Sequence, residues 1–293
     1  MNYIFMTDAS CDLTPELAKE IKVEVIPMEF EMEDKSYLHY IDSRMMSQEE
    51  FYTKLKSGVI AKTSQVNYNT FINYFEPYLK AGKDVLYTGI PGGLSGTYNT
   101  CMIAVKELQE KYPDRKIIAI DSCCDSLGLG QLVYLAGKKY TEGTSIDELA
   151  DFINETKVKV CHWFVVKDLD HLKRVGWISD VTATFGKALQ IKPLLGVNDD
   201  GSLANIGKIR GESNVISTLI KHYERDAENP KNNIVFVAHA DNVEGAEELK
   251  KRLKGTCKEV IILSIGPIIG SHVGSGLLAI TFLGDRNTNN WNI

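Results

Sequence analysis

The chain has 293 residues, of which 44% are hydrophobic and 25% are charged, and its formal net charge at pH 7 is −6. This is an ordinary globular composition, and the length is sufficient for two domains. The acidic balance argues against a nucleic-acid-binding protein, which normally carries a basic stripe. The most apolar run, 260–270, is too short to span a bilayer and is interrupted by Pro267. The first residues lack the basic start of a signal peptide, so we expect a cytoplasmic protein without a transmembrane segment.

The first half of the chain alternates between short apolar runs and helical patterns. We expect strands over 3–6, 84–90 and 116–122, and helices from about Pro15 and over 49–58, 96–112 and 126–140. Strands that alternate with helices at this spacing indicate a parallel sheet.

The second half has a different pattern of predicted strands and helices. We expect strands over 160–166, 232–240, 257–266 and 277–284, a short helix over 168–176, a helix from Val243, and a hairpin over 191–211 around the turn 199–201. A hairpin within an α/β pattern predicts a mixed sheet. We therefore predict two α/β domains: residues 1–155 with a parallel sheet and residues 156–293 with a mixed sheet, followed by a frayed polar tail from residue 284.

Polar, glycine-rich loops recur where predicted strands end or helices begin. They are residues 7–12, 63–65, 91–100, 121–130 and 266–276. In open α/β sheets, ligands bind beyond the carboxyl ends of the strands, and helix N-termini favour anions. Any single loop is explained as an ordinary turn, whereas five together indicate a binding site. The chain has no P-loop, no dinucleotide-binding glycine motif, no nucleophile elbow and no paired-histidine metal motif. Hydroxyls, backbone amides and His272 therefore point to a small carboxylate or phosphate, with no cofactor or metal.

The order of these motifs resembles the DegV family over nearly the whole chain. The matching segments are TDASCDLTPEL (7–17), TSQ (63–65), GLSGTY (93–98), DSCCDSLGLG (121–130), DLDHLKRVGWIS (168–179), the hairpin 191–211, and IGPIIGSHVGSG (265–276). The resemblance implies two α/β domains with a lipid between them. It also implies a non-catalytic subunit that buries a long-chain fatty acid and presents its carboxylate to a separate ATP-using kinase, which forms acyl phosphate.

The resemblance also implies a set of site residues. Thr63 and Ser95 match the hydroxyls that bind the carboxylate, and His272 matches a histidine beside the same group. Ser64 and the Gly96 amide add donors, and a protonated His272 adds a charge-assisted hydrogen bond.

The chain departs from the family pattern at two positions. Trp177 stands where the family has an arginine, and Ser275 stands where it has a proline. The remaining basic residues expected to face the kinase or the phosphate are Arg174, Lys208 and Arg210, although such a group is also typical of a solvated face. Two other functions stay open. One is a carrier or sensor of another amphipathic carboxylic acid without phosphorylation, and the other is an acyl hydrolase with Ser95 as nucleophile and His272 as base.

Overall fold

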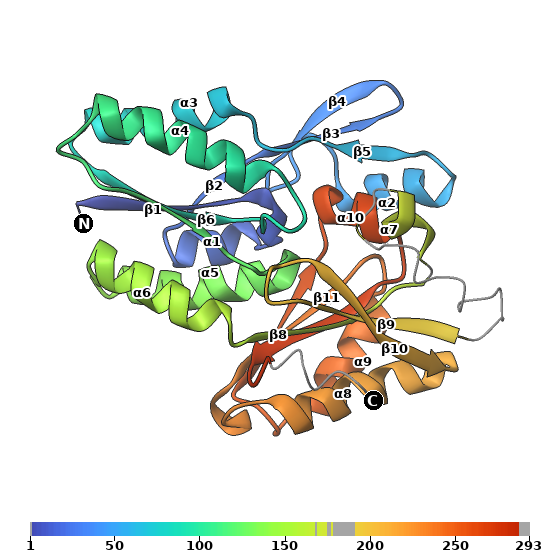
Figure 1. Ribbon diagram of the computed structural model, residues 1–293. Helices are drawn as coiled ribbons and strands as arrows, with labels where there is room; N and C mark the ends of the chain where they lie inside the picture. The colour runs from blue at the N-terminus through green and yellow to red at the C-terminus, as the bar shows by residue number, and fades with distance from the viewer. Residues whose placement is uncertain (1, 168, 175–176, 178–190, 287–293) are drawn as a thin grey trace.

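The computed structural model describes residues 2–167, 169–174, 177 and 191–286, which form two stacked α/β halves (Figure 1). One half contains a four-stranded parallel sheet with a small three-stranded sheet beside it, and the other contains a six-stranded sheet. The predicted domain boundary at residue 155 falls in the last turn of a helix, just before the first strand of the six-stranded sheet.

The N-terminal sheet is parallel, as the alternation of strands and helices predicts. Its order is β2-β1-β6-β7, with β1 (Tyr3–Asp8), β2 (Glu24–Ile26), β6 (Asp84–Gly89) and β7 (Ile117–Asp121). Helices α3 (Tyr68–Lys80) and α4 (Thr97–Lys111) cover one face, and α1 (Pro15–Glu20), α5 (Ser126–Thr141) and α6 (Ile146–Lys157) lie on the other (Figure 1). All four strands end at the same edge, where the polar loops collect.

A second, antiparallel sheet was not predicted. It has the order β4-β3-β5, with β3 (Met28–Met32), β4 (Lys35–His39) and β5 (Ala61–Thr63), and α2 (Gln48–Lys56) lies between β4 and β5 in the chain. The two-residue turn between β3 and β4 is Glu33-Asp34, whose φ angles are 52° and 57°. Such turns usually contain Asn-Gly or Asp-Gly. Because Glu-Asp is not a typical turn sequence, the hairpin cannot be predicted from these residues.

The C-terminal sheet is mixed, as predicted. Its order is β10-β9-β8-β13-β11-β12, with β8 (Val160–Val165), β9 (Ile191–Val197), β10 (Leu203–Arg210), β11 (Ile234–His239), β12 (Glu259–Ser264) and β13 (Leu278–Leu283). Only the pairing of β11 with β12 is parallel among these described strands. The predicted hairpin is β9–β10. Helices α8 (Val215–Asp226) and α9 (Val243–Leu253) cover the outer face (Figure 1).

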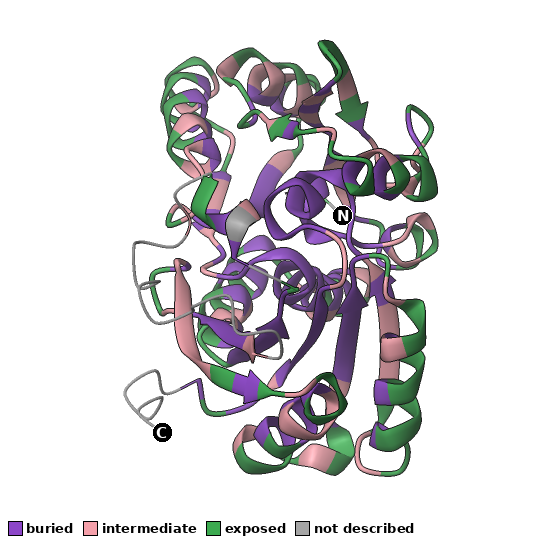
Figure 2. Cartoon of the chain, turned by 90° about the vertical axis from the view of Figure 1, so that its right-hand side faces the viewer, coloured by how far each residue is buried: buried purple, intermediate pink, exposed green. Residues whose placement is uncertain are grey.

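Helix α5 joins the two halves. It packs against β1 on one side and against β8, β11 and β13 on the other. Gly128 and Gly137 make this close packing possible, because a Cβ at Gly128 would overlap the His162 ring and one at Gly137 would overlap Ile21. One hydrophobic core therefore runs from the parallel sheet to the inner face of the mixed sheet, and Figure 2 shows the segments between the sheets as buried.

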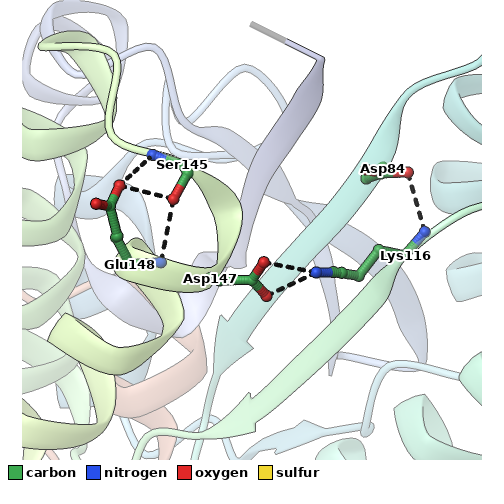
Figure 3. A network of polar contacts seen from close by, with 5 residues as sticks. All are labelled: Asp84, Lys116, Ser145, Asp147 and Glu148. Carbon is green, nitrogen blue, oxygen red and sulfur yellow. Dashed lines mark hydrogen bonds and ion pairs between the residues drawn. The ribbon is translucent and has the colours of Figure 1, made fainter.

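Helix α6 is fixed to the parallel sheet by the polar contacts drawn in Figure 3. Ser145 and Glu148 form a reciprocal capping box, which satisfies two backbone N–H groups at the helix start. Lys116 donates to both carboxylate oxygens of Asp147, at 2.7 and 2.6 Å, and the Lys116 amide donates to Asp84 at 2.9 Å. Of these contacts, the exposed Lys116–Asp147 pair is the one that joins α6 to the residue before β7.

The start of the predicted frayed tail is in fact anchored. Arg286 is 5% exposed, and its guanidinium donates to the carbonyl oxygens of Lys157, Cys123 and Val197 at 3.0, 2.8 and 3.2 Å. The prediction was wrong here because polar composition does not reveal that one arginine satisfies several buried carbonyls. Residues 287–293, the rest of the predicted tail, lie outside the described residues. So does Gly176, the predicted end of the short helix that forms α7 (Asp170–Arg174).

Candidate functional site

A cleft of about 550 Å³ brings together the head-group residues expected from the sequence. Its lining includes Thr63, Ser64, Gln65, Ser95, Gly96, Arg174, Trp177, Ile268 and His272. Thr63 is the last residue of β5 and Ser64 follows it, Ser95 and Gly96 precede α4, and His272 lies on α10 (Pro267–Val273). Residues that are more than 200 positions apart in the chain therefore share one cavity.

The segment that carries His272 is a helix. The sequence pattern predicts a strand end followed by a glycine-serine loop, but β12 ends at Ser264 and α10 begins at Pro267. Proline is well suited to the first position of a helix, and Gly274, with φ of 72°, ends it. The helical spacing puts Ile268 and His272 on the cleft side, whereas Ile269 and Val273 line a second cavity behind the helix.

A hydrogen bond between the two halves lies in the cleft. Thr63 Oγ1 is 2.8 Å from His272 Nε2. His272 is 7% exposed, and its Nδ1 atom has no hydrogen-bond partner among the described residues. The Trp177 ring packs on the imidazole, with 4.1 Å between ring centroids. The departure from the family's arginine therefore places an aromatic wall against His272, which sequence reasoning did not anticipate.

His272 is neutral at pH 7. Burial, together with the neighbouring His171, lowers the pKa of His272 from 6.5 to about 4. The protonated His272 expected beside a bound carboxylate is thus not the state of the ligand-free chain, because the low dielectric around the ring opposes the charge. An anion beside Nε2 would act in the opposite direction.

Ser95 and Gly96 form the start of α4 and contact the 63–66 segment. Ser95 Oγ lies 2.9 Å from Thr97 Oγ1 and accepts from the Thr97 amide at 3.2 Å. Thr97 Oγ1 in turn accepts from the Val66 amide at 3.2 Å. A Cβ at Gly96 would overlap the Gln65 amide, so glycine allows the two segments to approach.

The basic residues expected to face a partner do not gather in one place. Arg174 is exposed at the cleft, beside Trp177 and His272. Lys208 and Arg210 lie on β10 and line a different groove, between β10 and α8. Of these three basic residues, the structure therefore brings Arg174 to the head-group residues, while Lys208 and Arg210 line the separate groove.

An apolar cavity lies behind α10, and sequence reasoning missed it. Its volume is about 20 Å³, and its apolar walls include Leu127, Phe164, Val197, Ile269, Val273 and Leu277. These residues come from α5, β8, β9 and α10 and from the residue before β13, so no local pattern joins them. Strands β8 and β13 are buried along nearly their whole length, so no alternation of polar and apolar residues marks which of their side chains face the cavity.

The part of the chain that the structure describes contains no helix with the length and apolar character needed to cross a membrane. In the same residues, no three His, Cys, Asp or Glu side chains are grouped to hold a metal ion.

The fold and the site define a class of α/β proteins. Its features here are two linked α/β halves, a polar cleft on one side of a short helix and an apolar cavity on the other side. The chain belongs to the DegV family, since the sequence profile described as "Uncharacterised protein, DegV family" matches residues 4–285. It is 41% identical to a DegV domain-containing protein of Clostridium perfringens over 285 residues, which cover 97% of this chain and 98% of that protein. The resemblance seen in the sequence motifs is thereby confirmed.

Solved structures confirm the fold. A DegV lipid binding protein from Thermotoga maritima has a TM-score of 0.85 and 25% identity, with 97% of this chain and 99% of that chain covered. A DegV family protein from Thermus thermophilus, described by its fatty acid binding, has a TM-score of 0.86 and 25% identity, with 97% and 100% covered. A fatty acid binding DegV family protein from Streptococcus agalactiae has a TM-score of 0.81 and 26% identity, with 97% and 99% covered.

Proposed function

We propose that the chain binds one long-chain fatty acid, holds its carboxylate in the cleft, and presents that carboxylate to a separate ATP-using kinase for acyl-phosphate formation. The observation that carries the proposal is the hydrogen-bonded pair Thr63–His272, in a cleft that Ser95 and Gly96 also line. The fatty acid binding described for the relatives from Thermus thermophilus and Streptococcus agalactiae supports the same ligand class.

The cleft offers the donors that a carboxylate needs. Burying an unpaired carboxylate costs several kcal/mol, so hydroxyls and amides must replace its water. The hydroxyls of Thr63 and Ser95 are half-buried, and that of Ser64 is exposed, all on the cleft wall. Gly96 is the N-cap of the 15-residue helix α4, whose dipole favours negative charge at this end. On ligand binding, His272 becomes the donor that the carboxylate stabilises in its protonated form.

The acyl chain supplies the affinity. Each buried methylene contributes about 0.8 kcal/mol, so about 15 methylenes contribute on the order of 12 kcal/mol before ordering costs. The walls behind α10, among them Leu127, Phe164 and Ile269, have the apolar character for this role. Because that cavity has only about 20 Å³, the proposal requires these side chains to separate as the chain enters.

The partner would approach the exposed side of the cleft. Ser64 and Arg174 are exposed there, and Arg174 is the basic residue that this proposal assigns to the transferred phosphate. Lys208 and Arg210 line another groove, so the proposal assigns them to contact with the kinase away from the cleft. ATP as the phosphate donor is consistent with a cytoplasmic protein.

The acyl hydrolase is the weaker alternative. In an acyl hydrolase the base bonds to the nucleophile and is oriented by a third group. Here His272 Nε2 bonds to Thr63, and Ser95 Oγ lies beside Thr97. This pairing supports a carboxylate-binding site rather than a catalytic nucleophile with its base.

The test combines the purified chain, a fatty acid, ATP and a fatty acid kinase catalytic subunit, with acyl phosphate trapped by hydroxylamine. We expect product only when all four are present and when Thr63 and Ser95 are intact. Binding without product would replace the proposal by a carrier or sensor. Turnover of an acyl ester by the chain alone would replace it by the hydrolase.

A further inference from the structure

Three buried polar atoms belong to residues that line the apolar cavity behind α10, and none has a hydrogen-bond partner among the described residues. They are Asp125 Oδ1, His162 Nε2 and Thr281 Oγ1. Their residues are 6%, 4% and 0% exposed. An unpaired buried polar group destabilises the folded state, so three around one cavity point to something that binds there.

His162 and Thr281 are matched in position and in chemistry. They face each other in the β8–β13 register, so both side chains lie on the inner face of the sheet. His162 Nδ1 lies 2.9 Å from the Val160 carbonyl, and therefore carries the hydrogen that it donates. Burial and the nearby Arg286 lower the pKa of His162 well below 6.5, so the ring is neutral and Nε2 is an acceptor. A single hydroxyl between the two would donate to His162 and accept from Thr281.

Apart from these polar atoms, the walls of the cavity that the acyl chain would open are mostly apolar. Its volume of about 20 Å³ holds about one oxygen-sized group, and Leu127, Phe164 and Leu277 provide apolar walls. It shares α10 with the head-group cleft, since Ile269 and His272 lie on different sides of that helix. One helix diameter, on the order of 10 Å, separates the two, so an acyl chain with its carboxylate in the cleft reaches the cavity with its middle part.

We propose that this cavity binds a hydroxyl group borne on the middle of the acyl chain, and that hydroxylated fatty acids are preferred ligands of this protein. The inference rests on the proposed function, because it requires the carboxylate to lie in the cleft. The inference adds hydroxylated fatty acids as a ligand class that His162 and Thr281 recognise. The head-group residues contact only the carboxylate, so they cannot distinguish a hydroxylated fatty acid from a plain one.

The experiment measures displacement of a fluorescent fatty acid from the purified protein by stearic acid and by stearic acids hydroxylated at successive mid-chain positions. We expect one hydroxylated isomer to bind about tenfold more tightly than stearic acid, as for two buried groups that gain partners. Thr281→Val, which removes the hydroxyl and keeps the shape, abolishes that preference, and Thr281→Ser retains it. Thr88→Val is the matched control: Thr88 Oγ1 is equally buried and unpartnered, but it lies on β6 away from the cavity.

Equal or weaker binding of every hydroxylated isomer overturns the inference and leaves a buried water as the occupant. A preference that survives in Thr281→Val overturns it as well. If stearic acid binds and the preference is absent, the proposed function stands alone. If no fatty acid displaces the fluorescent ligand, the proposed function fails too.

Discussion

Asp12 is bonded to Gly266, the residue that starts the helix carrying His272. Asp12 Oδ1 accepts from the Gly266 amide at 2.8 Å, and Asp12 Oδ2 accepts from Ser126 Oγ at 2.6 Å. The first polar loop thus holds the starts of α10 and α5 at once. Because α10 separates the cleft from the apolar cavity, this carboxyl group helps to set the position of both.

The same group predicts how stability depends on pH. Burial raises the pKa of Asp12 to about 8, from 3.8, and raises the pKa of Asp125 to about 7. The folded state therefore binds more protons than the unfolded state between pH 4 and 8. The free energy of unfolding consequently decreases as the pH rises through this range. We expect the free energy of unfolding to fall between pH 6 and 8 by about 2 kcal/mol per pH unit, with both groups contributing. Urea denaturation at each pH measures it.

Asp12→Asn is the matched variant, because an amide keeps the acceptor for Gly266 and cannot ionise. Its free energy of unfolding should depend less on pH than that of the wild type above pH 6. A wild-type profile that rises between pH 6 and 8, or an unchanged slope in the variant, would contradict this assignment.

His272 predicts the pH dependence of ligand binding. Its pKa is about 4 in the ligand-free chain, and a carboxylate beside Nε2 raises it. The complex then takes up a proton, so affinity should increase as the pH falls from 7 towards 5. Calorimetric titration with a fatty acid measures this. His272→Gln keeps a polar side chain without a proton to gain, and an equal pH dependence in both proteins would assign the effect to the ligand alone.

Gly96 predicts a packing effect at the cleft wall. In Gly96→Ala the new methyl group overlaps the Gln65 amide, which must leave Thr100 and shift at the cleft wall. We expect about a fivefold loss of affinity for a fatty acid, equivalent to one hydrogen bond, with little change in stability. Gly207→Ala is the control, since a Cβ there meets open space. Equal affinities of the two variants would show that Gly96 is an ordinary turn residue.

The hydrogen bonds of Arg286 predict that replacing this residue lowers the free energy of unfolding substantially. Arg286→Met leaves the carbonyl oxygens of Cys123, Val197 and Lys157 without their donor inside the protein. We expect a loss of roughly 3 kcal/mol in the free energy of unfolding. Arg44→Met removes an exposed arginine paired with Asp42 and should change the free energy of unfolding very little. Comparable losses in the two variants would refute the anchoring role of Arg286.

The alternation of strands and helices predicted the sheet types, and the family resemblance implied that Thr63, Ser95 and His272 share one site. In the structure the three residues come from three different sheets, since Thr63 ends β5, Ser95 follows β6 and His272 lies on the helix after β12. The sequence did not predict the β3–β4 hairpin, whose turn uses Glu33 and Asp34 in an uncommon backbone conformation. It also missed α10, since a seven-residue helix rich in glycine, serine and isoleucine lacks a helical pattern of its own.

Other features of the site depend on long-range packing. The neutral state of His272 follows from burial by segments far away in the chain, including His171. The separation of Arg174 from Lys208 and Arg210 follows from how β10 joins the sheet. Neither property is encoded in local spacing, so only the assembled fold determines it.

The most direct measurement is mass spectrometry of the organic extract from denatured, purified protein, made for the wild type and for the Thr63→Ala/Ser95→Ala double variant. Our account predicts about one fatty acid per wild-type chain and much less in the variant, because the carboxylate loses two donors while the apolar cavity stays intact. A wild-type protein that is empty, and remains empty after incubation with fatty acids, would contradict the account.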